Sequence, residues 1–143
     1  AEDENVEKII TVGAEWHQKH LSGVREIFEA VNLDFVKKNL SGQLAAYQTD
    51  NPEPDVEKWA AALRTMWLDE SESGYPNESV REITANVLAI RGEADFLLAF
   101  DDWAELKTEL PDAHLMNVPF AAHEAIKEQP EIILAAVQAF QAL

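Results

Sequence analysis

A carboxylate and an imidazole each follow a short apolar run in the second half of the chain. Asp95 comes shortly after residues 86–91, and His123 comes shortly after residues 113–118. Such runs predict buried parallel strands, whose carboxyl ends meet at one edge of a sheet about 4.8 Å apart. A carboxylate that fixes the tautomer of an imidazole lets that imidazole act as a general base. The alternative is two unrelated polar residues in surface loops.

Two other histidines, His17 and His20, lie three residues apart with Glu15 nearby. On a helix, this spacing could turn two imidazoles toward one metal ion. No third ligand completes the pattern and Lys19 lies between them, so we expect exposed histidines at the start of a helix, no metal site and no cofactor. The chain also lacks cysteine, which excludes a thiol nucleophile, a disulfide framework and a cysteine-bound zinc site.

The hydrophobic pattern predicts an α/β fold in which three strands are flanked by helices. Amphipathic helices are expected after the second and third strands, and Pro130 suits the first turn of the last helix. Strands that alternate with helices through short connections are typical of a parallel sheet. The predicted strands are residues 6–12, 86–91 and 113–118.

The segment between the first and second predicted strands, from about residue 16 to residue 84, has a helical pattern. Apolar residues recur at spacings of three and four from Leu21 to Val31, which predicts one apolar helical face. Another helix is expected at residues 33–40. The clearest helix is predicted from Val56 to Trp67, with Asp55 as its N-cap.

Length and charge restrict the classes of function. The 143 residues include 27 Asp and Glu but only 11 Lys and Arg, which gives a formal charge of −16. Such an acidic chain repels phosphate groups, so we expect neither nucleic acid nor an anionic membrane as a partner. No apolar run approaches the roughly 18–20 residues of a membrane span. The acidic residues at positions 2–4 are unlike the basic start of a signal peptide. The absence of cysteine is most simply explained by a reducing, cytoplasmic setting.

Two segments resemble motifs of the α/β-hydrolase family. Residues 87–95, Val-Leu-Ala-Ile-Arg-Gly-Glu-Ala-Asp, resemble its seventh-strand motif, in which an apolar strand ends in Gly-x-x-Asp. Residues 113–123 resemble its eighth-strand motif, in which the catalytic histidine follows a small residue. Ala121 and Ala122 stand where the family often has glycine. The segment from Pro130 through the closing helix also matches.

The resemblance covers nearly the whole chain and implies its organisation. Residues 1–15 would contain a strand of the hydrolase core, residues 16–84 would form an inserted helical cap or lid, and residues 85–143 would form the C-terminal βαβα part of the core. The chain would therefore be the C-terminal part of an α/β-hydrolase fold.

The resemblance also implies roles for individual residues. Asp95 would be the acid and His123 the base of a catalytic triad. Trp16 follows the first strand and is a candidate to line a pocket for an ester-like or apolar small molecule. Phe96 and Trp67 are further candidates, although core packing is the alternative for Trp67.

The serine nucleophile of the family is missing from these residues. It sits in a Gly-x-Ser-x-Gly turn that precedes the acid and the histidine, and the chain has no such motif. Its five serines all lie in the predicted cap or in the approach to the second strand: 22, 41, 71, 73 and 79. We therefore expect the sequence to begin after the nucleophile and the isolated chain to be inactive.

The alternative is a non-catalytic binding or interaction module built on half of a hydrolase fold. The predicted strand at residues 6–12 would lack a partner on one side. An unpaired strand edge and an uncovered sheet face both promote association. We therefore expect the chain to self-associate through that edge or through the sheet face.

Overall fold

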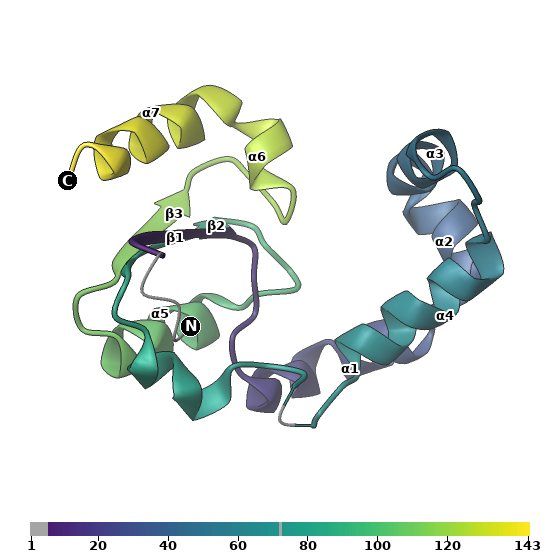
Figure 1. The fold of residues 1–143 in the computed structure, drawn as a ribbon, viewed down its shortest axis with the longest axis horizontal. Coiled ribbons are helices and arrows are strands. Elements are labelled where there is room, and N and C mark those ends of the chain that lie inside the picture. The colour runs from purple at the N-terminus through teal and green to yellow at the C-terminus, as the bar shows by residue number, and fades with distance from the viewer. Residues whose placement is uncertain (1–5, 72) are drawn as a thin grey trace. The chain divides into compact units, whose positions relative to one another are not determined.

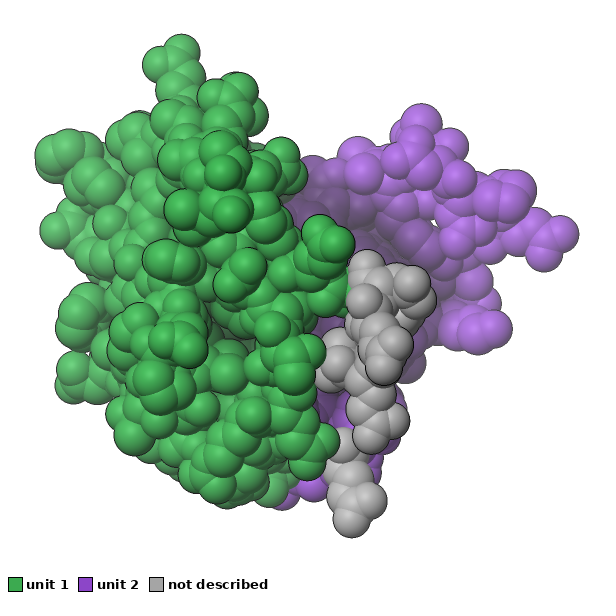
Figure 2. All heavy atoms as spheres, turned by 60° about the vertical axis from the view of Figure 1, so that its left-hand side comes forward, with its two compact units in different colours: residues 1–20, 76–143 green, residues 21–75 purple. Residues whose placement is uncertain are grey.

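The computed structural model describes residues 6–71 and 73–143. The chain divides into two compact units, of which one contains residues 1–20 and 76–143 and the other contains residues 21–75 (Figure 2). The acidic start and the first part of the predicted 1–15 core segment lie outside the described residues.

The first unit is built on a three-stranded parallel sheet in the order β1-β2-β3 (Figure 1). The predicted strands are confirmed, with ends that differ by one or two residues. The central strand is buried from Val87 to Gly92, as expected of a parallel strand covered on both faces. The strands are β1 Lys8–Val12, β2 Asn86–Gly92 and β3 His114–Val118.

Helices cover both faces of this sheet (Figure 1). On one face, α6 (Ala125–Glu128) and α7 (Pro130–Gln141) contribute residues to a buried cluster that also includes Leu88 and Ile90 of β2. On the other face, α5 (Phe100–Glu109) contributes residues to a second buried cluster that also includes Ala89 of the same strand. Successive residues of a strand point to opposite faces, so β2 contributes to both clusters.

Residues 21–75 form a helical unit with a small core of its own, in which Val31, Val36 and Ala60 are buried together. The side chain of Asp55 accepts a hydrogen bond from the backbone N–H of Lys58 at 3.0 Å. Asp55 is therefore the N-cap of α4, as the sequence predicts. Across the described parts of both units, no helix has the length and apolar character needed to cross a membrane. The helices are α1 Arg25–Glu29, α2 Leu33–Asn39, α3 Ser41–Asp50 and α4 Val56–Trp67.

The prediction of one helical face from Leu21 to Val31 is wrong about the backbone. A 3-10 helix, η1 (Gln18–Gly23), ends before α1 begins, and Val24 between them has a non-helical φ of −124°. Gly23 explains the break, because glycine is among the weakest helix formers. Leu21, Val24 and Val31 are nevertheless buried, as the apolar pattern requires. A second 3-10 helix, η2 (Asn77–Glu82), precedes β2.

Candidate active site

The loops that follow β2 and β3 are tied together along their backbones. The N–H of Glu93 donates to the carbonyl of Val118 at 2.8 Å, which continues the pairing of the two strands. One residue later, the N–H of Ala94 donates to the carbonyl of Ala121 at 2.9 Å. These bonds hold the two loops side by side, so that the residues that follow them, Asp95 and His123, meet.

The Nδ1 atom of His123 lies 3.1 Å from each carboxylate oxygen of Asp95. The Asp95 side chain is completely buried, whereas the His123 side chain is 36% exposed. The backbone N–H groups of Leu97 and Leu98 also donate to Asp95 Oδ1, at 2.9 and 3.1 Å. With Nδ1 donating to the carboxylate, Nε2 is left to exchange a proton with a reacting group. The structure thus brings together the two side chains that the sequence singles out.

Each member of this pair favours the charged form of the other. Burial by itself would raise the pKa of Asp95, but hydrogen bonds from His123 and from the Leu97 and Leu98 amides outweigh it, so that this pKa lies below its usual value. The hydrogen bond to Asp95 raises the pKa of His123 above its usual value, although burial opposes the change. A protonated imidazole, the form produced by a general base, is therefore stabilised here.

Two glycines allow backbone to approach the histidine loop closely. Gly13, directly after β1, has a φ of +62°, and a Cβ added there would lie 3.1 Å from Cε1 and 3.2 Å from Nδ1 of His123. A Cβ added at Gly92 would lie 2.0 Å from the carbonyl oxygen of Ala122. The carboxyl ends of all three strands therefore border the histidine or its loop, and side chains at these two positions would displace them.

The three predicted pocket residues have different surroundings. Trp16 is buried in the cluster on the α5 side of the sheet, and its Nε1 donates to the backbone carbonyl of Asp102 at 3.1 Å. Phe96, the neighbour of Asp95 in sequence, is 68% exposed. Trp67 ends α4 in the other unit, with its ring 5.2 Å from that of Phe28. A pocket role for all three stays a prediction.

The histidines after β1 are not exposed, so that prediction is wrong. His20 is buried, with Nδ1 2.7 Å from Glu15 Oε1 and Nε2 3.2 Å from Glu105 Oε2. The Nε2 atom of His17, whose side chain is also largely buried, lies 3.3 Å from Glu78 Oε1. The rings thus attach the segment after β1 to α5 and η2. Within the described residues, no group of three or more His, Asp or Glu side chains is arranged to hold a metal ion.

Sequence reasoning missed Arg91, which it treated as the end of the second strand. Arg91 lies inside β2 and is only 3% exposed. Arginine is almost never fully buried unless its donors are paired. A charged residue at the end of a continuous apolar run is therefore a signal that could have identified it.

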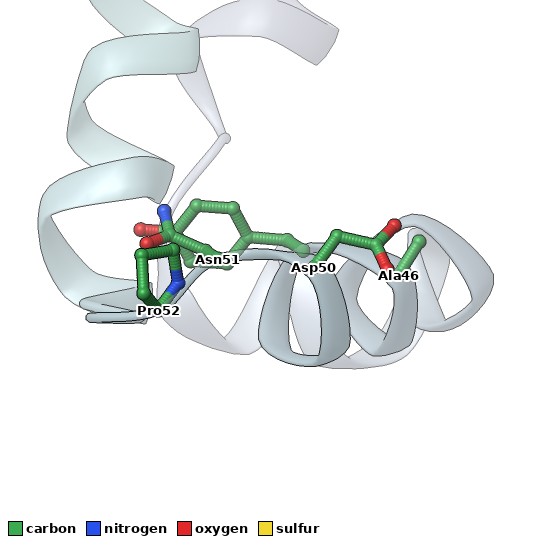
Figure 3. Close-up of a pocket in the computed structure, with 5 residues that line it drawn as sticks. Ala46, Asp50, Asn51 and Pro52 are labelled. Atoms are coloured by element: carbon green, nitrogen blue, oxygen red, sulfur yellow. The ribbon is translucent and has the colours of Figure 1, made fainter.

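A pocket of about 440 Å³ is present in the unit of residues 21–75, at the end of α3 (Figure 3). Its lining contains one carboxylate, that of Asp50, and no histidine or serine. The phenol ring of Tyr47, also in the lining, stacks on Trp59 with 4.8 Å between the ring centroids. We assign this pocket no chemistry. It is lined by Ala46, Tyr47, Asp50, Asn51 and Pro52.

Comparison with solved structures identifies the fold. The chain is similar to E-2-(acetamidomethylene)succinate hydrolase, with a TM-score of 0.64, 20% identity, and coverage of 96% of this chain and 58% of that one. It is also similar to a thermophilic esterase from Thermogutta terrifontis, with a TM-score of 0.63, 15% identity, and coverage of 94% and 55%. A third match is MGS-M2, an α/β hydrolase from a Medee basin deep-sea metagenome library, with a TM-score of 0.58, 17% identity, and coverage of 96% and 56%.

These likenesses concern the fold alone, because the sequence identities are low. No protein-family model matches the sequence, and no curated protein matches it either. The chain spans a little more than half the length of each solved structure named above. With its parallel sheet and its helices on both faces, the chain has an α/β-hydrolase-like fold, as its motifs predict.

Proposed function

We propose that this chain is the C-terminal part of an α/β-hydrolase in which Asp95 is the acid and His123 the base of a Ser-His-Asp triad. The observation that carries the proposal is the contact between His123 Nδ1 and the buried Asp95 carboxylate at 3.1 Å. This contact leaves Nε2 for proton transfer, which is the arrangement that a triad requires. The substrate class that we propose is an ester or a similar acyl compound.

The proposed reaction requires a serine from outside these residues. Within the described residues, none of the five serines of the chain comes directly after a strand. As the serine oxygen attacks the carbonyl carbon, His123 Nε2 takes the hydroxyl proton and then gives it to the leaving alkoxide. The acyl group is then bound to the serine oxygen. Water attacks this acyl group while His123 takes a proton from the water and gives it to the serine oxygen, which releases the carboxylic acid product and restores both serine and imidazole. The resemblance assigns residues from about 16 to 84 to a cap that sets substrate choice.

The decisive experiment uses the polypeptide as its native coding sequence specifies it. We expect it to contain Gly-x-Ser-x-Gly upstream of these residues, to react with a fluorophosphonate probe and to hydrolyse p-nitrophenyl esters. His123→Gln and Asp95→Asn should each lower kcat by about 10³-fold or more. His114→Gln, at the opposite end of β3, is the matched control and should retain activity. Full activity in His123→Gln would refute the triad.

The isolated 143-residue chain provides a second test. We expect it to show no ester hydrolysis and no labelling by the fluorophosphonate probe, since both need the serine. Hydrolysis that disappears in His123→Ala would show that a nucleophile lies within these residues. That result would contradict the proposed location of the serine but would retain the role of His123.

The second candidate function, a non-catalytic interaction module, is favoured by one observation. Among the described residues, β1 pairs with β2 on one side and with no strand on the other. Unpaired strand edges recruit further strands. We propose that the isolated chain self-associates through this edge. Light scattering over a concentration series should show dimers or larger species, and a monomer at high concentration would contradict this. A native product of 16 kDa would favour the module over the hydrolase.

A further inference from the structure

We propose that Arg91 is a positioning residue that shapes the loop of Asp95 and keeps its carboxylate directed at His123. The inference rests on the proposed triad roles of these two residues. It adds a residue from inside the sheet whose hydrogen bonds go to Leu98, Asn117 and Asp95 rather than to the imidazole.

The guanidinium of Arg91 is buried and donates hydrogen bonds in three directions. Its Nε donates to the carbonyl oxygen of Leu98 at 3.1 Å, and its Nη2 donates to the carbonyl oxygen of Asp95 at 3.2 Å. Its Nη1 donates to the side-chain oxygen of Asn117 at 2.8 Å. All three acceptors are uncharged oxygens, so the guanidinium acts here as a rigid set of donors.

The loop after β2 presents its carbonyl groups to Arg91 and its amide groups to the carboxylate. The carbonyls of Asp95 and Leu98 accept from Arg91, while the N–H groups of Leu97 and Leu98 donate to Asp95 Oδ1. Leu98 takes part in both sets of bonds. The two carbonyls lie at residues 95 and 98 and so bracket the amides of residues 97 and 98 in the chain. A guanidinium that holds both carbonyls therefore restrains the segment whose amides hold the carboxylate.

Arg91 also links this loop to the strand that leads to His123. Asn117 lies opposite Arg91 in the register of β2 and β3, and β3 ends one residue later. The ring of Phe100 lies over the guanidinium, with 5.8 Å between Cζ and the ring centroid. The buried guanidinium thus contacts two backbone carbonyls of the Asp95 loop, at residues 95 and 98, and a side chain of the neighbouring strand. Lysine cannot reproduce this, because its single ammonium lacks the planar fork.

The inference predicts how His123 titrates when Arg91 changes. We expect ¹⁵N-detected NMR titration of the 143-residue chain to show a lower midpoint for His123 in Arg91→Lys and Arg91→Met. Asp95→Asn should lower that midpoint by about one pH unit or more, because the carboxylate is lost. Asn117→Ala removes one of the three acceptors and should produce a smaller shift. In each Arg91 variant, the amide signals of Leu97 and Leu98 should move as well.

The controls separate a failure of this inference from a failure of the proposed function. Arg81→Met removes an exposed guanidinium that pairs with Glu109 and should leave the His123 midpoint unchanged. An unchanged His123 midpoint in Arg91→Lys, together with a lowered one in Asp95→Asn, would overturn the role of Arg91. It would leave the proposed pairing of Asp95 with His123 intact. An unchanged midpoint in Asp95→Asn would overturn the pair itself. If Arg91→Met does not fold, Arg91→Lys and Asn117→Ala decide the question.

Discussion

The ion pair of Asp95 and His123 predicts a stability difference that depends on pH. The raised pKa of His123 means that its contribution is complete below the unfolded value of 6.5 and is lost as pH rises through the folded-state pKa. The lowered pKa of Asp95 means that its contribution is present above the unfolded value of 3.8 and is lost as pH falls through the folded-state pKa. Both contributions are therefore complete between these two unfolded-state values.

The geometry sets the size of the effect. A hydrogen bond to a charged group contributes about 1.5–3 kcal/mol to stability. The His123 side chain is 36% exposed, so solvent screening reduces the contribution to about 1 kcal/mol. We therefore expect His123→Gln to lower the free energy of unfolding by about 1 kcal/mol more at pH 5.5 than at pH 9.

Urea denaturation followed by tryptophan fluorescence measures this difference. Subtracting the variant from the wild type at each pH removes the titration of the groups that both proteins share. His114→Gln, at the opposite end of β3, controls for the loss of an imidazole as such. Equal losses of stability in His123→Gln at both pH values would refute the reasoning, because the pair would then gain nothing from protonation of His123.

Three further predictions concern a close backbone contact, a helix N-cap and a residue with a positive φ. Gly92→Ala should lower the free energy of unfolding by more than about 2 kcal/mol, since its Cβ would lie 2.0 Å from the Ala122 carbonyl oxygen; an unchanged urea midpoint would contradict this close approach. Asp55→Ala removes the N-cap of α4 and should cost about 1 kcal/mol, seen as earlier loss of helical circular dichroism in urea. Phe120 is 84% exposed with a φ of +61°, so Phe120→Asn should raise stability by up to about 1 kcal/mol, and a lower melting temperature would argue against strain there.

Much of the sheet and the meeting of Asp95 with His123 could be predicted because they follow from local patterns. Short apolar runs show where the strands lie, and parallel strands bring their carboxyl ends together whatever the residues between them. The Asp55 cap could be predicted for the same reason, since its partner is three residues away.

The features that the sequence did not reveal depend on partners distant in the chain or on backbone groups. His20 is buried because it contacts Glu105, 85 residues later, and no periodicity reports that contact. Arg91 is satisfied by two carbonyl oxygens and by Asn117, and carbonyl direction cannot be read from residue types. The break at Val24 follows Gly23, whose weak helix propensity the apolar spacing of the segment does not report.

The position of Gly13 makes the imidazole of His123 a built-in reporter of the first strand. Gly13 donates its N–H to the carbonyl of Ile90 at 2.8 Å, and no side chain separates its Cα from the ring. A strand that joined the outer edge of β1 and moved it slightly would therefore change the magnetic surroundings of the ring protons at once. The NMR signals of one histidine would then report assembly at the far edge of the strand that ends beside it.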